Sequence, residues 1–310
     1  MNAPSGEQHV IVFGEQTAVV TEIGATLRSY VDGTTAVCWG FDEDQMSGGG
    51  RGQLLAPWPN RLRDGLYEFR GISAHAPIDE VARMVAIHGL VRWVPWRLVE
   101  KHPDRVVLDY RLHPQPAYPF GVHLVMTYVL GRDGLEGTLE AVAEGDGPIP
   151  FGAGFHSYIS GGSGGVDSVR LAVPASSRFI LDDRALPVGV EAVEGTPSAA
   201  IAGNTPFAER EAIGALRVDD CYTGVFVEPD GKWRALVQRE GEDRPVTVWA
   251  ESVFKHIMCF TGDTLPPGDR RLGIAIEPMT CPPDAFRTGE DLIVLEPGAS
   301  FSGSWGITPA

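Results

Sequence analysis

The feature that most constrains the fold of this chain is an apolar period of two. It runs through RVVLDYRL (residues 105–112), HLVMTYVL (123–130) and KWRALVQRE (232–240). Such alternation is typical of β-strands that bury one face and expose the other. We therefore expect one face of each strand to lie in a core, with these members: Val106, Leu108, Tyr110, Leu112, Leu124, Met126, Tyr128, Leu130, Trp233, Ala235 and Val237.

Turn signals separate the strand-like runs. Asp64-Gly65, Asp133-Gly134 and Asp230-Gly231 are dipeptides typical of hairpin turns, and each precedes a β-rich segment. The 38 glycines and 24 prolines interrupt the chain too often for long helices, and only residues 209–216 resemble a short helix. Many short strands without β–α alternation predict an all-β sandwich or barrel-like fold.

The sequence shows no linker that would divide the chain. GGSGG at residues 161–165 is the nearest candidate, but strand-like sequence resumes directly after it, so we interpret it as a surface loop. No internal repeat of fixed period is visible. The 310 residues suffice for a large core, and we expect a single domain over residues 1–310.

Composition and charge narrow the class of partner. Hydrophobic residues make up 43% of the chain and charged residues 21%, which is typical of a globular protein and not of a disordered one. The formal net charge of -16 repels polyanions, so nucleic acid and anionic membranes are disfavoured as partners. A small anionic substrate is compatible with this charge, because a local pocket can oppose the global field.

The sequence predicts neither export nor membrane insertion. The first ten residues, MNAPSGEQHV, are polar, and no apolar run reaches membrane-spanning length. Cys38, Cys221, Cys259 and Cys281 are dispersed and form no CxxC pair. We therefore expect reduced thiols in a cytoplasmic protein.

Five polar stretches that contain glycine or proline lie outside the alternating runs and hold the candidate site residues. They are APWPNRLRDG (56–65), IHGLVRW (87–93), GFHSYI (154–159), VDDCYTG (218–224) and IEPMTCPPDAF (276–286).

The basic candidates each have a structural and a functional interpretation. Arg61 is either a loop arginine that satisfies nearby carbonyls or a guanidinium directed at hydroxyl or carboxylate oxygens. His88 and His156 are either core histidines or groups that meet a ligand. Gly89, directly after His88, permits the close approach of a backbone or a ligand.

The acidic candidates also have a structural and a functional interpretation. Asp219 and Asp220 suit a turn, because aspartate often bonds its own backbone. Glu277 ends the apolar strand LGIAI, so it faces either a pocket or solvent. Partial burial there would raise its pKa, as a general base requires.

Motifs for metals and nucleotide cofactors are missing from the sequence. The eight histidines form no HxxxH pair, and no Cys/His group has zinc spacing. No GxGxxG, Walker loop or GxSxG elbow occurs. We therefore expect no metal and no cofactor.

Taken in order, the five stretches resemble the aldose 1-epimerase (galactose mutarotase) family, and the resemblance runs from about Arg51 to Trp305. PNRLRDGLYEF is similar to the family's Asn-Arg segment, and HGLVRW to its histidine-glycine motif. PFGAGFHSYI is similar to the strands around its second histidine, DDCYTG to a later landmark, and IEPMTCPPDAF to its C-terminal glutamate motif. The resemblance implies a large two-layer β-sandwich, the galactose mutarotase-like supersandwich.

The resemblance also implies an activity, the interconversion of the α and β anomers of free hexoses such as glucose or galactose, without a cofactor. It implies Glu277 as the base at the C1 hydroxyl and His156 as the acid at the ring oxygen. Arg61, His88 and Asp219 would hold the sugar. The ordinary histidine pKa of about 6.5 suits proton exchange near neutrality. The expected partner is a small sugar, and the expected assembly a monomer or homodimer.

Departures from the family pattern leave the acid and base unchanged but leave the preferred sugar open. Ser157, Asp220, Cys221 and Met279 differ from the residues common in the family's galactose branch.

HGLVR, with Arg92 four residues after His88, also resembles the hexose-6-phosphate 1-epimerase branch, in which Arg92 and Arg63 would bind the phosphate. The competing interpretation of Arg92, which we favour, is a strand arginine that points to solvent. Two further alternatives are a non-catalytic sugar-binding protein on the same fold and a glycosidase or lyase that uses Asp219 and Glu277.

Overall fold

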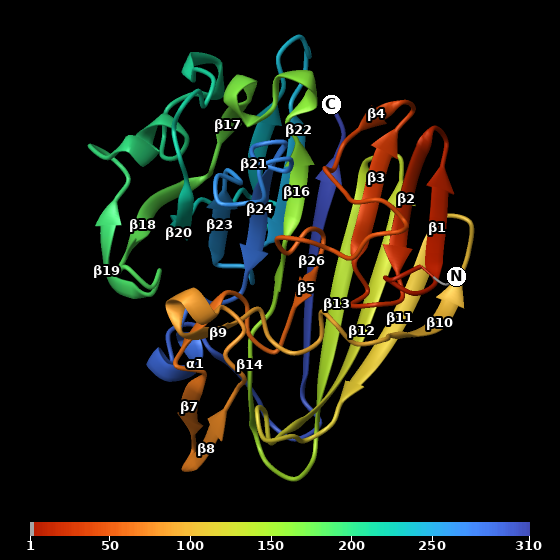
Figure 1. Cartoon of the computed structure of the whole chain (residues 1–310), viewed down its shortest axis with the longest axis vertical. Coiled ribbons are helices and arrows are strands. Elements are labelled where there is room, and N and C mark those ends of the chain that lie inside the picture. Colours follow the sequence, from red (N-terminus) through yellow and green to blue (C-terminus); the bar gives the residue numbers. More distant parts are fainter. Residues whose placement is uncertain (1–2) are drawn as a thin grey trace.

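A computed structural model describes residues 3–310 and shows a chain built almost entirely of strands in two layers (Figure 1). The expected all-β sandwich is confirmed.

The first layer is one antiparallel sheet of eight strands in the order β10-β11-β12-β13-β26-β22-β21-β17. Its strands are β10 (Arg97–Lys101), β11 (Arg105–Leu112), β12 (Gly121–Gly131), β13 (Gly134–Glu144), β26 (Ser300–Thr308), β22 (Val246–Glu251), β21 (Lys232–Gln238) and β17 (Arg170–Ala172).

The second layer consists of a four-stranded and an eight-stranded sheet (Figure 1). The four-stranded sheet contains β1 (Gln8–Phe13), β2 (Gln16–Thr21), β3 (Leu27–Asp32) and β4 (Thr35–Ala36). The other follows the order β19-β18-β20-β23-β24-β15-β5, with β16 also paired to β24. Its strands are β19 (Pro187–Ala192), β18 (Ala175–Leu181), β20 (Asp219–Val225), β23 (His256–Phe260), β24 (Gly273–Met279), β15 (Gly154–Phe155), β5 (Leu54–Leu55) and β16 (Ser157–Ser160).

Three two-stranded ladders and a few short helices complete the described chain. The ladders pair β6 (Arg61–Arg63) with β9 (Val85–Ile87), β7 (Leu66–Phe69) with β8 (Ile72–His75), and β14 (Ile149–Phe151) with β25 (Ile293–Leu295). The helices are α1 (Ala285–Thr288) and the 3-10 turns η1 (Val81–Arg83), η2 (Gly162–Gly164), η3 (Val166–Ser168), η4 (Pro197–Ala200) and η5 (Phe207–Glu209). Within residues 3–310, none is long and apolar enough to cross a membrane.

The alternating residues face the interior between the layers. On β12 and β21 every apolar member of the predicted face is buried. On β11 the prediction was incomplete, because Tyr110 is only half-buried while Val107 and Asp109 on the opposite face are buried. Arg97 and His123 bind the Asp109 carboxylate and so satisfy this buried charge.

Of the three Asp-Gly signals, one closes a hairpin between paired strands. Asp133 lies in the two-residue loop that joins β12 to β13, where Gly131 opposes Gly134. Asp64-Gly65 joins β6 to β7, but these strands pair with β9 and β8 instead of with each other. Asp230-Gly231 is a turn that leads into β21. The prediction that each precedes a strand is confirmed.

The short helix expected at residues 209–216 is wrong. A 3-10 turn ends at Glu209, and the following backbone pairs with the β17 region instead. Ala212 bridges Arg170, and the Ile213 N–H donates to the Val169 carbonyl at 2.8 Å. Backbone groups engaged in this way are not available to a helix. The GGSGG segment is a surface loop, as expected, and it contains η2.

Leu139 on β13 tests the two-layer core. It is fully buried between β12 and β26, whereas the neighbouring Glu140 is exposed on the other face. We expect Leu139→Ala to lower the free energy of unfolding by about 2–5 kcal/mol, because it removes buried methyl groups and leaves a cavity. Urea unfolding measures this, with Glu140→Ala as the matched control. Equal effects of the two variants would contradict the assigned faces.

Candidate active site

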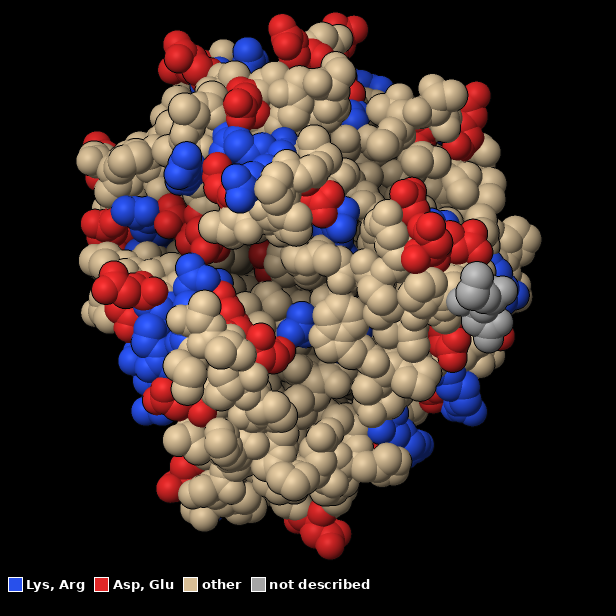
Figure 2. Space-filling view, viewed as in Figure 1, with Lys and Arg blue, Asp and Glu red and all other residues tan. Residues whose placement is uncertain are grey.

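A cavity of about 300 Å³ opens on the face of the molecule shown in Figure 2, where acidic and basic side chains surround a hollow. It lies between the sheet that contains β20, β23 and β24 and the β6–β9 ladder. The lining residues most relevant to chemistry are Arg61, Asp79, Glu80, Arg83, His88, Arg92, His156, Asp219 and Glu277. All five predicted site residues are among them, so the fold brings together residues 61, 88, 156, 219 and 277.

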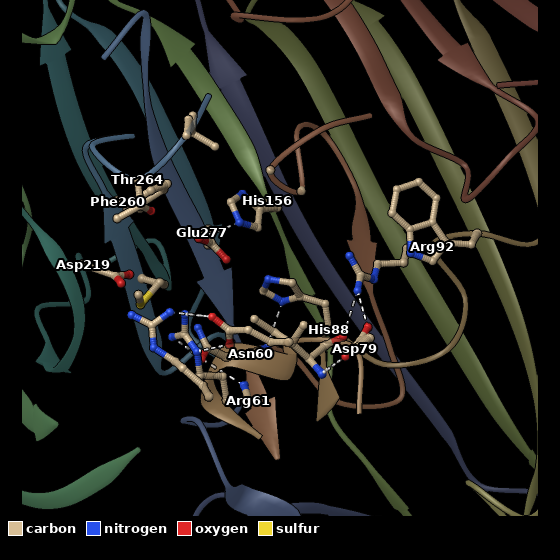
Figure 3. A pocket seen from close by; sticks show the side chains of 18 residues that line it. Asn60, Arg61, Asp79, His88, Arg92, His156, Asp219, Phe260, Thr264 and Glu277 are labelled. Atoms are coloured by element: carbon tan, nitrogen blue, oxygen red, sulfur yellow. Dashed lines mark hydrogen bonds and ion pairs between the residues drawn. The ribbon is translucent and has the colours of Figure 1, made fainter. Parts of the chain in front are cut away.

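Glu277 and His156 lie side by side at the base of this cavity (Figure 3). The Oε1 atom of Glu277 is 3.3 Å from the Nε2 atom of His156, and the side chains are almost completely buried. Glu277 lies on β24, and His156 lies between β15 and β16, which both pair with β24. Neighbouring strands thus place the carboxylate and the imidazole in contact.

The backbone around His156 is held on both sides. Its N–H donates to the Gln53 carbonyl and its carbonyl accepts from the Gly52 N–H, each at 2.9 Å. Gly50 passes so close that a Cβ there would lie 2.5 Å from the imidazole Cδ2. The ring also stacks on Tyr158, with centroids 5.1 Å apart. The imidazole therefore has one well-defined position.

Burial sets the protonation of this pair. It lowers the pKa of His156 to about 3, with the charges of Arg92 and Arg61 acting in the same direction. It raises the pKa of Glu277 well above the ordinary value, and the nearby Asp219 adds to this effect. The pKa near 6.5 expected for His156 is therefore wrong: burial favours the neutral form of this imidazole and the protonated form of the Glu277 carboxyl.

His88 is fixed by a reciprocal contact with Asn60. The backbone N–H of His88 donates to the Asn60 carbonyl at 2.9 Å, and the backbone N–H of Asn60 donates to the imidazole Nδ1 atom of His88 at 3.2 Å. Because Nδ1 accepts a hydrogen bond and burial holds the pKa of His88 well below its usual value, the proton lies on Nε2. His88 is therefore a hydrogen-bond donor beside His156, whose ring it meets edge-on at 5.2 Å.

Gly89 has a steric reason to follow His88. Both residues have left-handed backbone conformations, with φ of 65° and 68°. A Cβ on Gly89 would lie 2.0 Å from the Ala56 carbonyl oxygen, so a larger residue cannot occupy this position without movement. The group that approaches Gly89 closely is therefore the backbone of Ala56.

Arg61 is oriented by a carboxylate that the sequence analysis did not single out. Its Nε atom donates to Glu80 Oε2 at 2.7 Å and its Nη2 atom to Glu80 Oε1 at 3.3 Å. Burial alone would raise the pKa of Glu80, but hydrogen bonds from Arg61 and Arg83 outweigh it and lower that pKa. Such a two-point ion pair holds a guanidinium plane in place.

The two consecutive aspartates have opposite orientations. Asp219 lines the cavity, and burial raises its pKa against the opposing effect of Arg61. Asp220 points to the other side of β20, where Arg178 and Ser198 donate to its Oδ2 atom at 2.9 and 2.7 Å. The strand geometry thus places Asp219, and not Asp220, at the cavity.

Two expectations about arginines need correction. Arg92 does not point to solvent but lines the cavity, where its Nη2 atom donates to Asp79 Oδ2 at 2.6 Å. Arg63 lies outside the described cavity lining and donates to Asp284 at 3.4 Å. Asp79 holds Arg92 in its position, and Asp284 holds Arg63 in its own. The sequence around each arginine does not reveal these partners. Of the two proposed phosphate ligands, only Arg92 is at the site.

Sequence reasoning missed the segment that carries Asp79, Glu80 and Arg83. These residues lie in a connection between β8 and β9 that has no motif and no alternation, so no local signal marks them. Apolar walls were missed as well: Met258 and Phe260 of β23 and Leu265 beyond it. Within residues 3–310, no three His, Cys, Asp or Glu side chains are grouped to hold a metal ion.

Comparison with known proteins agrees with this architecture. A family model described as aldose 1-epimerase matches residues 9–308. The chain is 27% identical over 295 residues to the uncharacterized protein YihR of Escherichia coli K12, which corresponds to 95% of this chain and 90% of that protein.

Solved structures have the same fold at low identity. A galactose mutarotase-like protein from Clostridium acetobutylicum is 18% identical, with a TM-score of 0.81 over 96% of this chain and 93% of that chain. An aldose epimerase homologue from C. elegans is 18% identical, with a TM-score of 0.81 over 97% and 98% of the two chains.

The raised pKa of Glu277 predicts how stability depends on pH. As the pH rises above 4.5, the ordinary glutamate value, the unfolded chain loses this proton while the buried carboxyl keeps it. The contribution of Glu277 to the free energy of unfolding therefore falls with rising pH. Glu277→Gln does not titrate, so we expect it to gain stability relative to the native chain as the pH is raised from 4.5 toward neutrality.

Urea unfolding of both proteins at several pH values measures this difference. The same comparison in the His156→Asn background removes the titration of the imidazole that contacts Glu277. A difference in unfolding free energy that does not change with pH would contradict a buried, protonated carboxyl.

Proposed function

Because the chain belongs to the aldose 1-epimerase family, we propose that it is a mutarotase that interconverts the α and β anomers of a free hexose such as glucose or galactose. The observation that carries the proposal is the contact between the Glu277 carboxylate and the His156 imidazole at the base of a sugar-sized cavity.

The chemistry needs one base and one acid. Glu277 removes the proton from the C1 hydroxyl while His156 donates a proton to the ring oxygen, and the bond between C1 and that oxygen breaks. After rotation about the C1–C2 bond, the ring closes on the other face of the carbonyl. His156 then recovers its proton and Glu277 returns its own, so no proton is consumed.

The buried pair is suited to this exchange because it holds one proton in either arrangement. Burial favours the arrangement in which that proton lies on Glu277 and the imidazole is neutral. Transfer of the proton across the 3.3 Å contact forms the carboxylate base and the imidazolium acid in a single step. The polar groups of a bound sugar replace the missing solvation and favour the charged arrangement.

Substrate binding is assigned to the other side chains of the cavity. His88 offers its Nε2–H, Arg61 its guanidinium, and Asp219 a carboxylate that accepts from hydroxyl groups. Phe260 supplies an apolar surface for the C–H groups of the ring. Together they orient the C1 hydroxyl and the ring oxygen toward the proton-exchanging pair.

The charge balance of the cavity favours a neutral sugar. Arg61 and Arg83 are both paired with Glu80, and Arg92 is paired with Asp79. A phosphate at the sugar's C6 position would compete with these carboxylates for the guanidinium groups. The hexose-6-phosphate epimerase is the second candidate, because Arg92 lies in the cavity.

The anomerisation assay tests the proposed function directly. Freshly dissolved α-glucose and α-galactose are expected to reach anomeric equilibrium faster with the protein, as followed by polarimetry or a coupled β-specific oxidation. Faster equilibration of glucose 6-phosphate alone would favour the second candidate. Sugar binding without acceleration would contradict the enzyme and favour a binding module.

Variants test the assigned roles. Glu277→Gln and His156→Asn are each expected to lower kcat by about 10²–10⁴-fold, the usual contribution of a positioned acid or base. Circular dichroism and sugar binding should be retained in both. Glu136→Gln, on the exposed face of β13, is the matched control and should keep the native rate. A native kcat in either active-site variant would contradict its role.

A further inference from the structure

One wall of the cavity lacks support from the core. The rim segment, residues 79–84, contributes Asp79, Glu80 and Arg83 to the lining and contains η1. No residue of η1 is buried, and Val81 and Met84 are 69% and 55% exposed. Apolar packing therefore does not determine where this wall lies.

Local hydrogen bonds close the rim segment into a turn. The Arg83 N–H donates to the Glu80 carbonyl and the Met84 N–H to the Val81 carbonyl, each at 3.1 Å. Met84 has a left-handed conformation, with φ of 53°. These bonds shape the turn, but they do not orient it relative to the sheet that carries Glu277.

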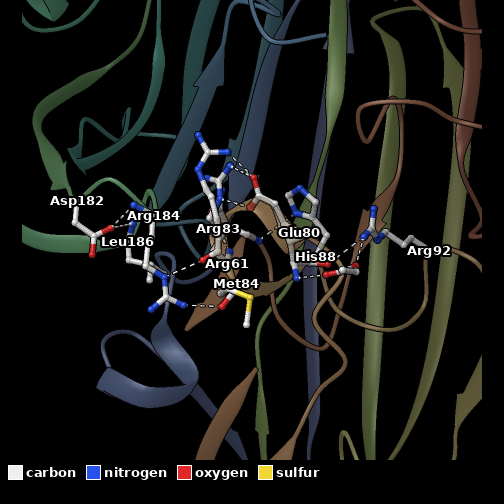
Figure 4. A network of polar contacts seen from close by, with 12 residues as sticks. Arg61, Glu80, Arg83, Met84, His88, Arg92, Asp182, Arg184 and Leu186 are labelled. Carbon is white, nitrogen blue, oxygen red and sulfur yellow. Dashed lines mark hydrogen bonds and ion pairs between the residues drawn. The ribbon is translucent and has the colours of Figure 1, made fainter. Parts of the chain in front are cut away.

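Arg184 makes that connection from about a hundred residues away (Figure 4). Its Nε atom donates to the Arg83 carbonyl at 2.8 Å and its Nη2 atom to the Met84 carbonyl at 2.6 Å. The Nη2 atom also donates to Asp64 Oδ1 at 2.7 Å, on the turn after β6. The Asp64 N–H also donates to the Met84 carbonyl at 3.2 Å, so the Arg184 guanidinium adds a side-chain link to a backbone contact between the rim segment and the turn after β6.

Arg184 is itself anchored at the tip of the β18–β19 hairpin. Asp182 Oδ1 accepts from the N–H groups of Arg184 and Leu186 at 2.9 and 3.0 Å. Leu186 is fully buried. The hairpin belongs to the sheet that contains β20 and β24, which carry Asp219 and Glu277. Arg184 therefore links the two sides of the cavity without being one of its described lining residues.

We propose that Arg184 is a positioning residue for the proposed epimerase. By holding the carbonyls of Arg83 and Met84, it fixes the rim segment and with it Glu80, whose carboxylate orients the Arg61 guanidinium. The inference rests on the proposed function only through the role of Arg61 in holding the sugar. A displaced guanidinium weakens substrate orientation while the Glu277–His156 pair stays in place.

Steady-state kinetics of Arg184→Ala test the proposal. We expect KM to rise by about 10- to 100-fold and the pH profile of kcat to be unchanged, because the proton-exchanging pair is untouched. The matched control is Arg234→Ala, which removes a similarly exposed guanidinium of β21 that pairs with Glu228 and Asp230. A native KM in Arg184→Ala, or an equal rise in the control, would overturn the proposal.

A double-mutant cycle separates positioning from general stability. Glu80→Gln weakens the link between the rim segment and Arg61, so adding Arg184→Ala to it should raise KM by much less than in the native background. A merely structural role would give additive effects and a lowered Tm without this coupling. Additivity would overturn the proposal.

Hydrogen exchange gives a readout that needs no activity. Arg184→Ala should speed exchange of the amides of Arg83, Met84 and Val85, and Arg234→Ala should not. Unchanged exchange at these amides would overturn the proposed link even if the enzyme is active. If the native protein accelerates no sugar, the proposed function fails, and the exchange result still decides whether Arg184 holds the rim segment.

Discussion

The site depends on one energetic fact, the burial of a carboxyl group beside a buried imidazole. In water Glu277 would be ionised and His156 partly protonated at neutral pH, and both would be mobile. Inside the sandwich, the cost of desolvating each charge pushes the two pKa values past one another, so the pair retains a single proton. Glu277 Oε2 and His156 Nδ1 have no hydrogen-bond partner among the described residues. Such a pair gains most from a polar ligand that reaches it.

The backbone makes this burial possible by approaching the side chains very closely. Gly50 leaves space for the His156 ring, and Gly89 lets the His88 turn pass against the Ala56 carbonyl. The paired strands β15, β16 and β24 hold Glu277 and His156, the groups to which we assign proton exchange. Other charged groups of the cavity, such as Glu80 and Arg83, lie on a connection where ion pairs replace apolar packing. Strand pairing therefore holds Glu277 and His156, whereas ion pairs hold the charged groups at the rim of the same cavity.

Much of the architecture follows from local sequence pattern. Alternation identified β12 and β21 and their buried faces, and the motif order identified the family to which the chain belongs. Alternation was less reliable on β11, because the sandwich covers both faces of that strand. The helix expected at residues 209–216 failed for a related reason: pairing with the β17 region outweighed local propensity.

The sequence by itself determined many of the strands, the all-β class and the chemical types available to the site, since these depend on side-chain period and residue identity. Only the tertiary structure decided which aspartate of the pair 219–220 meets the cavity, because successive residues of a strand point to opposite faces. It also decided that Arg92 faces inward and Arg63 does not, and that Glu80 orients Arg61. These are outcomes of contacts between segments far apart in the chain, and neither period nor spacing encodes them.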